Sequence, residues 1–245
     1  MKFGRKAACA VLGAWFIFFS VGAAFAQTTS ASGVVFADLS GTQSGVCTNA
    51  QQGAGPIKAK CGGDWIVLGA GGGGTFAGAS KYGMLTSKTN LSTTVFSETQ
   101  LTAGGVQTES AVTSAFSDVL GFPNLPDGTS AVLTATISLT GNATGLANVM
   151  AEVSLGGQLS NCQVQAIGTC TATVSFTGGT GPLNLSSEIV VNSSASVAAG
   201  VIGSSSASNK YVAKITALNV TLASGAKCRG DECAIVTASG HKYPK

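Results

Sequence analysis

The strongest constraint on how this chain folds is the repeated alternation of apolar residues with serine and threonine. Between Val132 and Thr140, apolar side chains occupy every second position, and Ser or Thr lies at the positions between them. Residues 149–155 and 172–176 repeat this period of two. Because successive side chains of a strand point to opposite faces of a sheet, each segment predicts a strand with one buried face.

The number of such segments predicts the fold class. Further candidates are residues 33–37, 65–68, 82–85, 93–97, 106–113, 115–120, 183–191 and 211–222. Without an intervening helical pattern, they predict an all-β fold, an antiparallel β-sandwich or jelly-roll-like arrangement with local disulfides. Turn residues at 141–145 predict a hairpin or meander between the strands that flank them. The alternation slips by one residue near Ala217, which predicts a β-bulge there.

The start of the chain resembles an export signal. Three basic residues within the first six positions precede an apolar run over residues 7–21, and Ala24-Phe25-Ala26 supplies the small residues that a signal peptidase accepts. We therefore expect residues 1–26 to be cleaved and the mature protein to begin at Gln27. The alternative is a membrane anchor, although a spanning helix needs about 20 apolar residues and this run is shorter.

The rest of the chain is expected to form one domain. Residues 27–245 predict a single β-sandwich with a loop-rich start at residues 27–64, of which 27–32 should be frayed. Cleavage removes three of the 13 Lys and Arg residues, which leaves 10 against the 10 acids and lowers the formal net charge from +3 to 0. A neutral chain has no general attraction for nucleic acid or anionic lipid, so neither is an expected partner.

Cysteine spacing agrees with export. One of the seven cysteines, Cys9, lies in the leader, and the other six form three pairs that are close in sequence. We expect disulfides between Cys47 and Cys61, Cys162 and Cys170, and Cys228 and Cys233, although six thiols formally allow 15 pairings. A zinc site is disfavoured, because the sequence has no C-x-x-C and a single histidine.

Two candidate ligand sites emerge from short motifs. Gly69, Gly71 and Gly74 have the G-x-G-x-x-G spacing of a dinucleotide-binding turn, but no helical pattern follows, which favours a flexible glycine turn. Asp118 and Asp127 flank a turn-rich segment and are the candidate ligands of a structural calcium ion, although their spacing is not that of an EF-hand. No other cofactor is expected.

Aromatic side chains offer limited support for sugar binding. Sugar rings stack on exposed aromatic platforms, and such residues are scarce after the leader. Trp65 lies in an apolar segment and is expected in the core, which leaves Tyr82 and Tyr211 as candidate ligand-binding residues.

Catalytic residues are hard to identify, and we expect none. Glu152 and Glu188 could form a glycosidase pair, which requires an acid and a base or nucleophile about 5–9.5 Å apart. They occupy the outward phase of predicted strands, where solvated carboxylates also lie. His241 lies near the end of the sequence, and we expect it to face solvent or cap a strand.

A short adhesion motif lies inside the last cysteine pair. Arg229-Gly230-Asp231 would be displayed on a tight loop closed by Cys228 and Cys233. This display resembles the ligands of animal adhesion receptors, but a polar turn accounts for the same three residues.

Three segments together resemble exported bacterial proteins of the PEP-CTERM sorting class: Ala79-Ser80-Lys81-Tyr82-Gly83-Met84-Leu85, Ala115-Phe116-Ser117-Asp118-Val119-Leu120 and Thr237-Ala238-Ser239-Gly240-His241-Lys242-Tyr243. The resemblance spans residues 79–243 and implies an extracellular β-rich protein of a Gram-negative envelope or matrix. That family ends in a Pro-Glu-Pro motif, an apolar helix and a basic tail, whereas this sequence ends in Tyr243-Pro244-Lys245. The difference favours free secretion or periplasmic residence.

These observations lead to three functional hypotheses. We expect a secreted, non-enzymatic structural or adhesive protein of the envelope or matrix, whose partners are surface polysaccharide or protein. The alternatives are a carbohydrate-binding module and a secreted hydrolase. Binding lost on Tyr82→Ala or Tyr211→Ala would favour the module, and turnover lost on Glu152→Gln or Glu188→Gln would favour the hydrolase.

Overall fold

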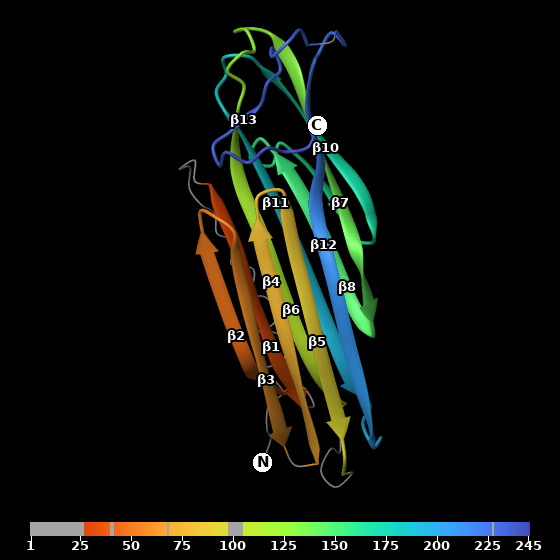
Figure 1. Ribbon diagram of the computed structural model, residues 1–245. Helices are drawn as coiled ribbons and strands as arrows, with labels where there is room; N and C mark the ends of the chain where they lie inside the picture. Colours follow the sequence, from red (N-terminus) through yellow and green to blue (C-terminus); the bar gives the residue numbers. More distant parts are fainter. Residues whose placement is uncertain (1–26, 40–41, 68, 98–104, 227) are drawn as a thin grey trace, which may run out of the picture.

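The protein is an elongated sandwich of two antiparallel β-sheets, as the alternation predicted (Figure 1). The computed structural model describes residues 27–245 apart from 40–41, 68, 98–104 and 227, so the predicted signal peptide at 1–26 lies outside the described residues. The strands are β1 (Thr28–Leu39), β2 (Thr42–Gly53), β3 (Ile57–Val67), β4 (Ala70–Lys81), β5 (Met84–Val95), β6 (Val106–Gly121), β7 (Ser130–Thr144), β8 (Leu146–Leu155), β9 (Ser160–Val164), β10 (Gly168–Thr177), β11 (Leu183–Val197), β12 (Gly203–Leu222) and β13 (Val236–Thr237). Within this part of the chain, no helix could cross a membrane.

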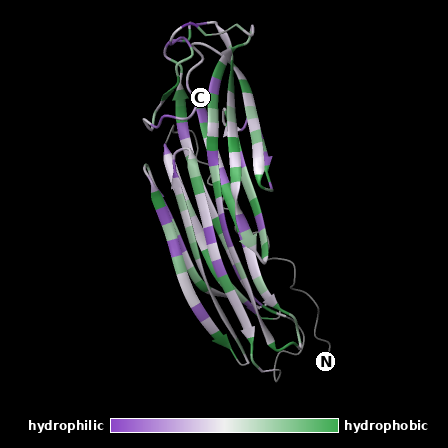
Figure 2. Cartoon of the chain, turned by 45° about the vertical axis from the view of Figure 1, so that its right-hand side comes forward, coloured by the Kyte–Doolittle hydropathy of each residue, from purple (hydrophilic) through white to green (hydrophobic). Residues whose placement is uncertain are grey.

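The two sheets divide the strands between them. One has the order β2-β1-β6-β11-β8-β9, with β13 added to β6, and the other has the order β10-β7-β12-β5-β4-β3. Strand β12 is 20 residues long, which corresponds to about 65 Å of extended chain. Figure 2 shows hydrophobic and hydrophilic residues alternating along these strands. The apolar residues of this alternation are the buried ones, and they form the core between the sheets.

Disulfides join the sheets at both edges. Cys47 on β2 bonds to Cys61 on β3, and Cys162 on β9 bonds to the β10 residue Cys170. Each bond links the edge strands of opposite sheets, with Cα atoms 6.0 and 5.9 Å apart. The third disulfide closes the loop between Cys228 and Cys233. The three predicted pairings are confirmed, and they indicate an oxidising setting outside the cytoplasm.

The core differs between the two ends of the sandwich. Around the C-terminal segment it contains large aliphatic residues, among them Leu120, Leu133, Ile137, Leu155, Leu185, Ile189 and Ile215. Towards the other end the buried side chains are smaller and often polar. Thr89, Ser193 and Asn209 form hydrogen bonds with one another in this region, and Thr93 donates to the carbonyl of Ala195 across the sheets at 2.7 Å. This half is therefore held partly by hydroxyl and amide contacts.

The expectation of a loop-rich start was wrong. Residues 27–64 contain β1, β2 and most of β3, and the predicted frayed residues include the buried Thr29 and Ala31. Strand β2 is an edge strand whose residues are mostly exposed on both faces, so backbone pairing with β1 holds it without an apolar alternation. The serine-rich residues 193–208 comprise the end of β11, a short connection and the start of β12.

The predicted hairpin at residues 141–145 is also wrong. Strand β7 continues to Thr144 and pairs with β10 and β12, whereas β8 pairs with β9 and β11 in the other sheet. The chain crosses between the sheets at Gly145, whose φ of 76° is left-handed. The alternation determines which face of each strand is buried, but not which strand lies beside it.

Two local predictions had different outcomes. The β-bulge is confirmed, because the register of β12 against β7 shifts between Ile215 and Ala217. The flexible glycine turn is wrong, because most of residues 69–74 lie in β4. A Cβ on Gly72 would lie 2.7 Å from Oγ1 of Thr108 and 2.9 Å from Cζ2 of Trp65, so close packing requires this glycine.

Candidate functional site

The two candidate sugar-binding tyrosines do not form an exposed platform. Tyr82 and Tyr211 retain 9% and 7% of their surface and belong to the main hydrophobic cluster. Tyr82 packs edge-on against Phe116, with ring centroids 6.1 Å apart. Their proposed role in stacking is therefore wrong, because a sugar ring cannot reach a buried aromatic face. Trp65 is partly buried, and its indole donates a hydrogen bond to Thr108.

The calcium prediction fails for Asp118. Its carboxylate is fully buried and accepts hydrogen bonds from the backbone N–H groups of Val119 and Ser239 at 2.8 and 3.1 Å. The hydroxyls of Ser239 and Tyr243 donate to it at 2.5 and 3.0 Å. These four donors satisfy the carboxylate, so Asp118 anchors the C-terminal segment to β6.

The residues around Asp118 form a structural cluster. Burial and the nearby carboxylate raise the pKa of Tyr243, whose ring also stacks on Phe116 with centroids 6.3 Å apart. His241 lies edge-on to Tyr243 at 4.7 Å, and burial lowers the pKa of its imidazole. The side chain of His241 is only partly buried. A Cβ on Gly83 would lie 2.9 Å from Nε2 of His241, so this histidine packs against the β4–β5 turn.

Asp127, the other candidate ligand, is exposed and lies apart from this cluster. It lines an open depression of about 490 Å³ beside Gly179 and the Phe122–Phe176 ring pair. Among the residues that the structure describes, no three His, Cys, Asp or Glu side chains are grouped to hold a metal ion. The paired calcium site predicted for Asp118 and Asp127 is therefore wrong.

The two candidate catalytic carboxylates do lie together. Glu188 on β11 is directly opposite Glu152 on β8, on the outer face of the seven-stranded sheet. Burial and the charge of Glu152 raise the pKa of Glu188, while Gln163 donates to Glu152 at 2.7 Å. The pair lies on a strand surface outside both described depressions.

Arg229-Gly230-Asp231 lies on the predicted disulfide-closed loop, and all three residues are exposed. The backbone N–H of Arg229 donates to the carboxylate of Glu232 at 3.0 Å. Asn124 donates to the carbonyl of Asp231 at 3.1 Å, which ties the loop to the β6–β7 connection.

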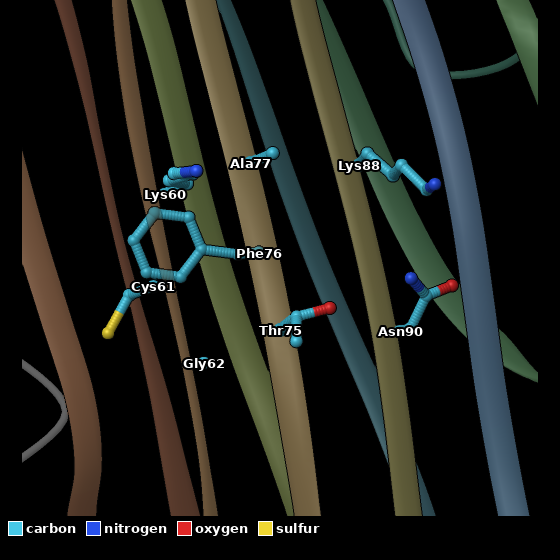
Figure 3. A pocket seen from close by; sticks show the side chains of 8 residues that line it. All are labelled: Lys60, Cys61, Gly62, Thr75, Phe76, Ala77, Lys88 and Asn90. Carbon is cyan, nitrogen blue, oxygen red and sulfur yellow. The ribbon is translucent and has the colours of Figure 1, made fainter.

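Another candidate site is a groove on the outer face of the six-stranded sheet. It has a volume of about 420 Å³ and is lined by Lys60, Cys61, Gly62, Thr75, Phe76, Ala77, Lys88 and Asn90. Figure 3 shows Lys60 and Lys88 on the strands that flank β4. The small residues Gly62 and Ala77 leave the groove shallow, and Lys60 and Lys88 give it positive charge.

This groove belongs to a larger basic surface, here called the lysine face. It comprises the exposed side chains of Lys58, Lys60, Lys81, Lys88, Lys210 and Lys214, from four adjacent strands, β3, β4, β5 and β12. Lys88 is directly opposite Lys210, and Lys60 lies in the same row across Ala77 of β4. Asp64 on β3 is the only acid on this face in the described strands.

Sequence reasoning missed the lysine face, although part of the signal was available. Lys58 and Lys60, and Lys210 and Lys214, are separated by even numbers of residues, which places each pair on one side of its strand. The sequence did not show that β3, β4, β5 and β12 are neighbours. Overall neutrality therefore concealed a strongly basic surface.

Comparisons with known proteins do not identify a relative. No family model matches this chain, and no curated protein or solved structure matches it.

Proposed function

We propose that this is a secreted, non-enzymatic structural or adhesive protein of the cell envelope or extracellular matrix. The observation that carries the proposal is the lysine face, on which exposed cations lie over four adjacent strands. A broad surface of one charge suits attachment to extended or repeated partners, because many weak contacts act together.

The scaffold supports this role. The sandwich is long, and disulfides join its sheets at both edges. Disulfides persist in an oxidising exterior and stabilise the fold there, so the sandwich can bear mechanical load. The leader-like sequence at residues 1–26 and the resemblance to envelope proteins agree with export.

Expression of the full chain in a Gram-negative host tests both export and attachment. We expect the protein outside the cytoplasm to begin at Gln27 and to remain with the surface or matrix fraction at about 0.01 M salt. Salt at about 1 M should release it, because the screening length falls from about 30 Å to 3 Å. Mass spectrometry and fractionation measure these outcomes.

A matched pair of variants tests the role of the lysine face. Changing Lys60, Lys88 and Lys210 to Gln should leave the protein in the medium, whereas changing Arg229, Lys242 and Lys245 to Gln should leave attachment intact. Both variants remove three positive charges. Retention of the chain in the cytoplasm, or its free release at every salt concentration, would overturn the proposed function.

A further inference from the structure

The charges of the described strands are largely separated by sheet, with Asp64 as the exception on the lysine face. The strands of the seven-stranded sheet, as the structure describes them, contain no Lys, Arg or His. Their outer surface carries Asp38 on β1, Glu109 on β6, Glu188 on β11 and Glu152 on β8, all partly exposed. This surface, here called the acidic face, lies on the opposite side of the sandwich from the lysine face.

Each face contains a pair of like charges that lie directly opposite each other on adjacent strands. Lys88 is directly opposite Lys210, and Glu152 is directly opposite Glu188. Like charges directly opposite each other on adjacent strands are destabilising. Burial, together with the neighbouring acid in each case, raises the pKa of Glu109 and of Glu188. An opposite charge from outside the molecule would relieve this repulsion on both faces.

The two faces span the same number of strands. By strand register, the lysines lie within four residues of one another along β5, and the acids lie within eight residues along β6. The acids lie on β1, β6, β11 and β8, which are four adjacent strands, as are the four strands that carry the lysines. Four strands span about 15 Å, and contact over about 40 Å of their length would cover ~600 Å² on each partner. The total of ~1,200 Å² is within the range of specific protein interfaces.

We propose that the lysine face of one copy binds the acidic face of a second copy, so that the protein stacks sheet against sheet. The contact joins two different surfaces, so each added copy leaves one face of each kind free and the stack can grow. This inference rests on the proposed function and names the partner through which a structural role would operate.

Sedimentation velocity of the purified, disulfide-bonded chain tests the proposal. At about 0.01 M salt we expect species that grow with protein concentration, and at about 1 M salt we expect monomers. The lysine-face variant K60Q/K88Q/K210Q and the acidic-face variant E109Q/E152Q/E188Q should each be monomeric at low salt. The control variants R229Q/K242Q/K245Q and D127N/D231N/E232Q carry the same changes in net charge and should still assemble.

Mixing the two face variants gives the most specific result. Each retains one intact face, so an equal mixture should form a heterodimer that does not grow further. Far-UV circular dichroism and thermal melting of each variant show that it is folded, and neutralising the facing acids should not destabilise the sandwich.

Three results would overturn the stacking proposal: a monomeric wild-type chain at ~1 mM and low salt, assembly that persists in both face variants, or a mixture that stays monomeric. If the chain is monomeric in these tests but is held on the cell exterior by its lysines, the stacking proposal fails while the proposed function stands. An acidic surface polysaccharide would then be the partner. If exterior attachment is also absent, both fail.

Discussion

The hydroxyl of Tyr243 provides a sharp test of how the C-terminal segment is held. It donates to the buried carboxylate of Asp118 at 3.0 Å, whereas the hydroxyl of Tyr82 donates to the neutral carbonyl of Ala54 at 3.3 Å. Tyr→Phe at either position removes one hydroxyl and keeps the ring. The two variants therefore compare a charged acceptor with a neutral one.

The expected magnitudes differ. A hydrogen bond to a charged group contributes about 1.5–3 kcal/mol and a neutral one about 0.5–1.5 kcal/mol. We expect Tyr243→Phe to lower the free energy of unfolding by about 2 kcal/mol, and Tyr82→Phe by about 1 kcal/mol or less. Guanidinium chloride unfolding at neutral pH measures both changes. Equal losses, or a smaller loss for Tyr243→Phe, would refute the assignment of Asp118 as the anchor.

The pH dependence gives a second readout. Burial raises the pKa of Tyr243 above its ordinary value of 10.0, so the unfolded chain loses this proton at lower pH than the folded protein does. Stability is therefore retained below pH 10 and falls above it, by about 1.4 kcal/mol per pH unit for one such group. Tyr82 adds to the slope because burial raises its pKa too. Tyr243→Phe should reduce the slope without abolishing it, and an unchanged slope would contradict this account.

Three further predictions concern the scaffold. Replacing Cys47 and Cys61 with Ala should lower the free energy of unfolding by about 3 kcal/mol, because their disulfide closes a 14-residue separation, and non-reducing denaturation curves measure this loss. Gly72→Ala should destabilise the protein by about 1–3 kcal/mol through overpacking against the Ser92 carbonyl of the neighbouring strand and the side chains of Thr108 and Trp65, while Gly45→Ala, with open space around it, should have little effect on the melting temperature. Asn209→Ala should cost about 1–3 kcal/mol in urea unfolding, because it removes the donor shared by two buried hydroxyls.

The sequence predicted the strands wherever one face is buried and the other is exposed. It also contained a signal that was not used. Tyr211 shares its phase with Ala213 and Ile215, and all three are buried, so its side chain should have been assigned to the core. Asp118 shares its phase with Phe116 and is buried for the same reason. In both cases residue type was given more weight than strand phase.

The pairing of strands that are distant in the chain could not be predicted from the sequence, for a physical reason. Alternation describes one strand at a time, whereas sheet membership depends on contacts between strands far apart in the chain. Asp118 meets Ser239 across 121 residues, and Lys88 meets Lys210 across an even longer separation. The disulfides could be predicted because each joins cysteines separated by 14 residues or fewer.

The acidic face makes a final prediction about stability and pH. Burial and the charge of Glu152 raise the pKa of Glu188 above its ordinary value of 4.5. Below that value the carboxyl is protonated in both the folded and the unfolded states, so it causes no penalty. As the pH rises through the raised pKa, the folded protein loses stability relative to the unfolded chain. At pH 7 the charged pair is therefore unfavourable.

Glu188→Gln should consequently increase the free energy of unfolding at pH 7 by about 0.2–1 kcal/mol, if the repulsion is as large as the favourable interactions of cross-strand pairs. The gain should disappear near about pH 3.5, where the wild-type carboxyl is also neutral. Asp127→Asn, at an exposed acid outside the strands, is the matched control and should give no such gain. Urea unfolding at the two pH values, at a salt concentration that keeps the protein monomeric, measures the difference. A loss of stability at pH 7, or a gain that persists in acid, would mean that Glu152 and Glu188 do not repel each other in the folded protein. The repulsion on the acidic face would then give no reason for a counter-charge from a second copy.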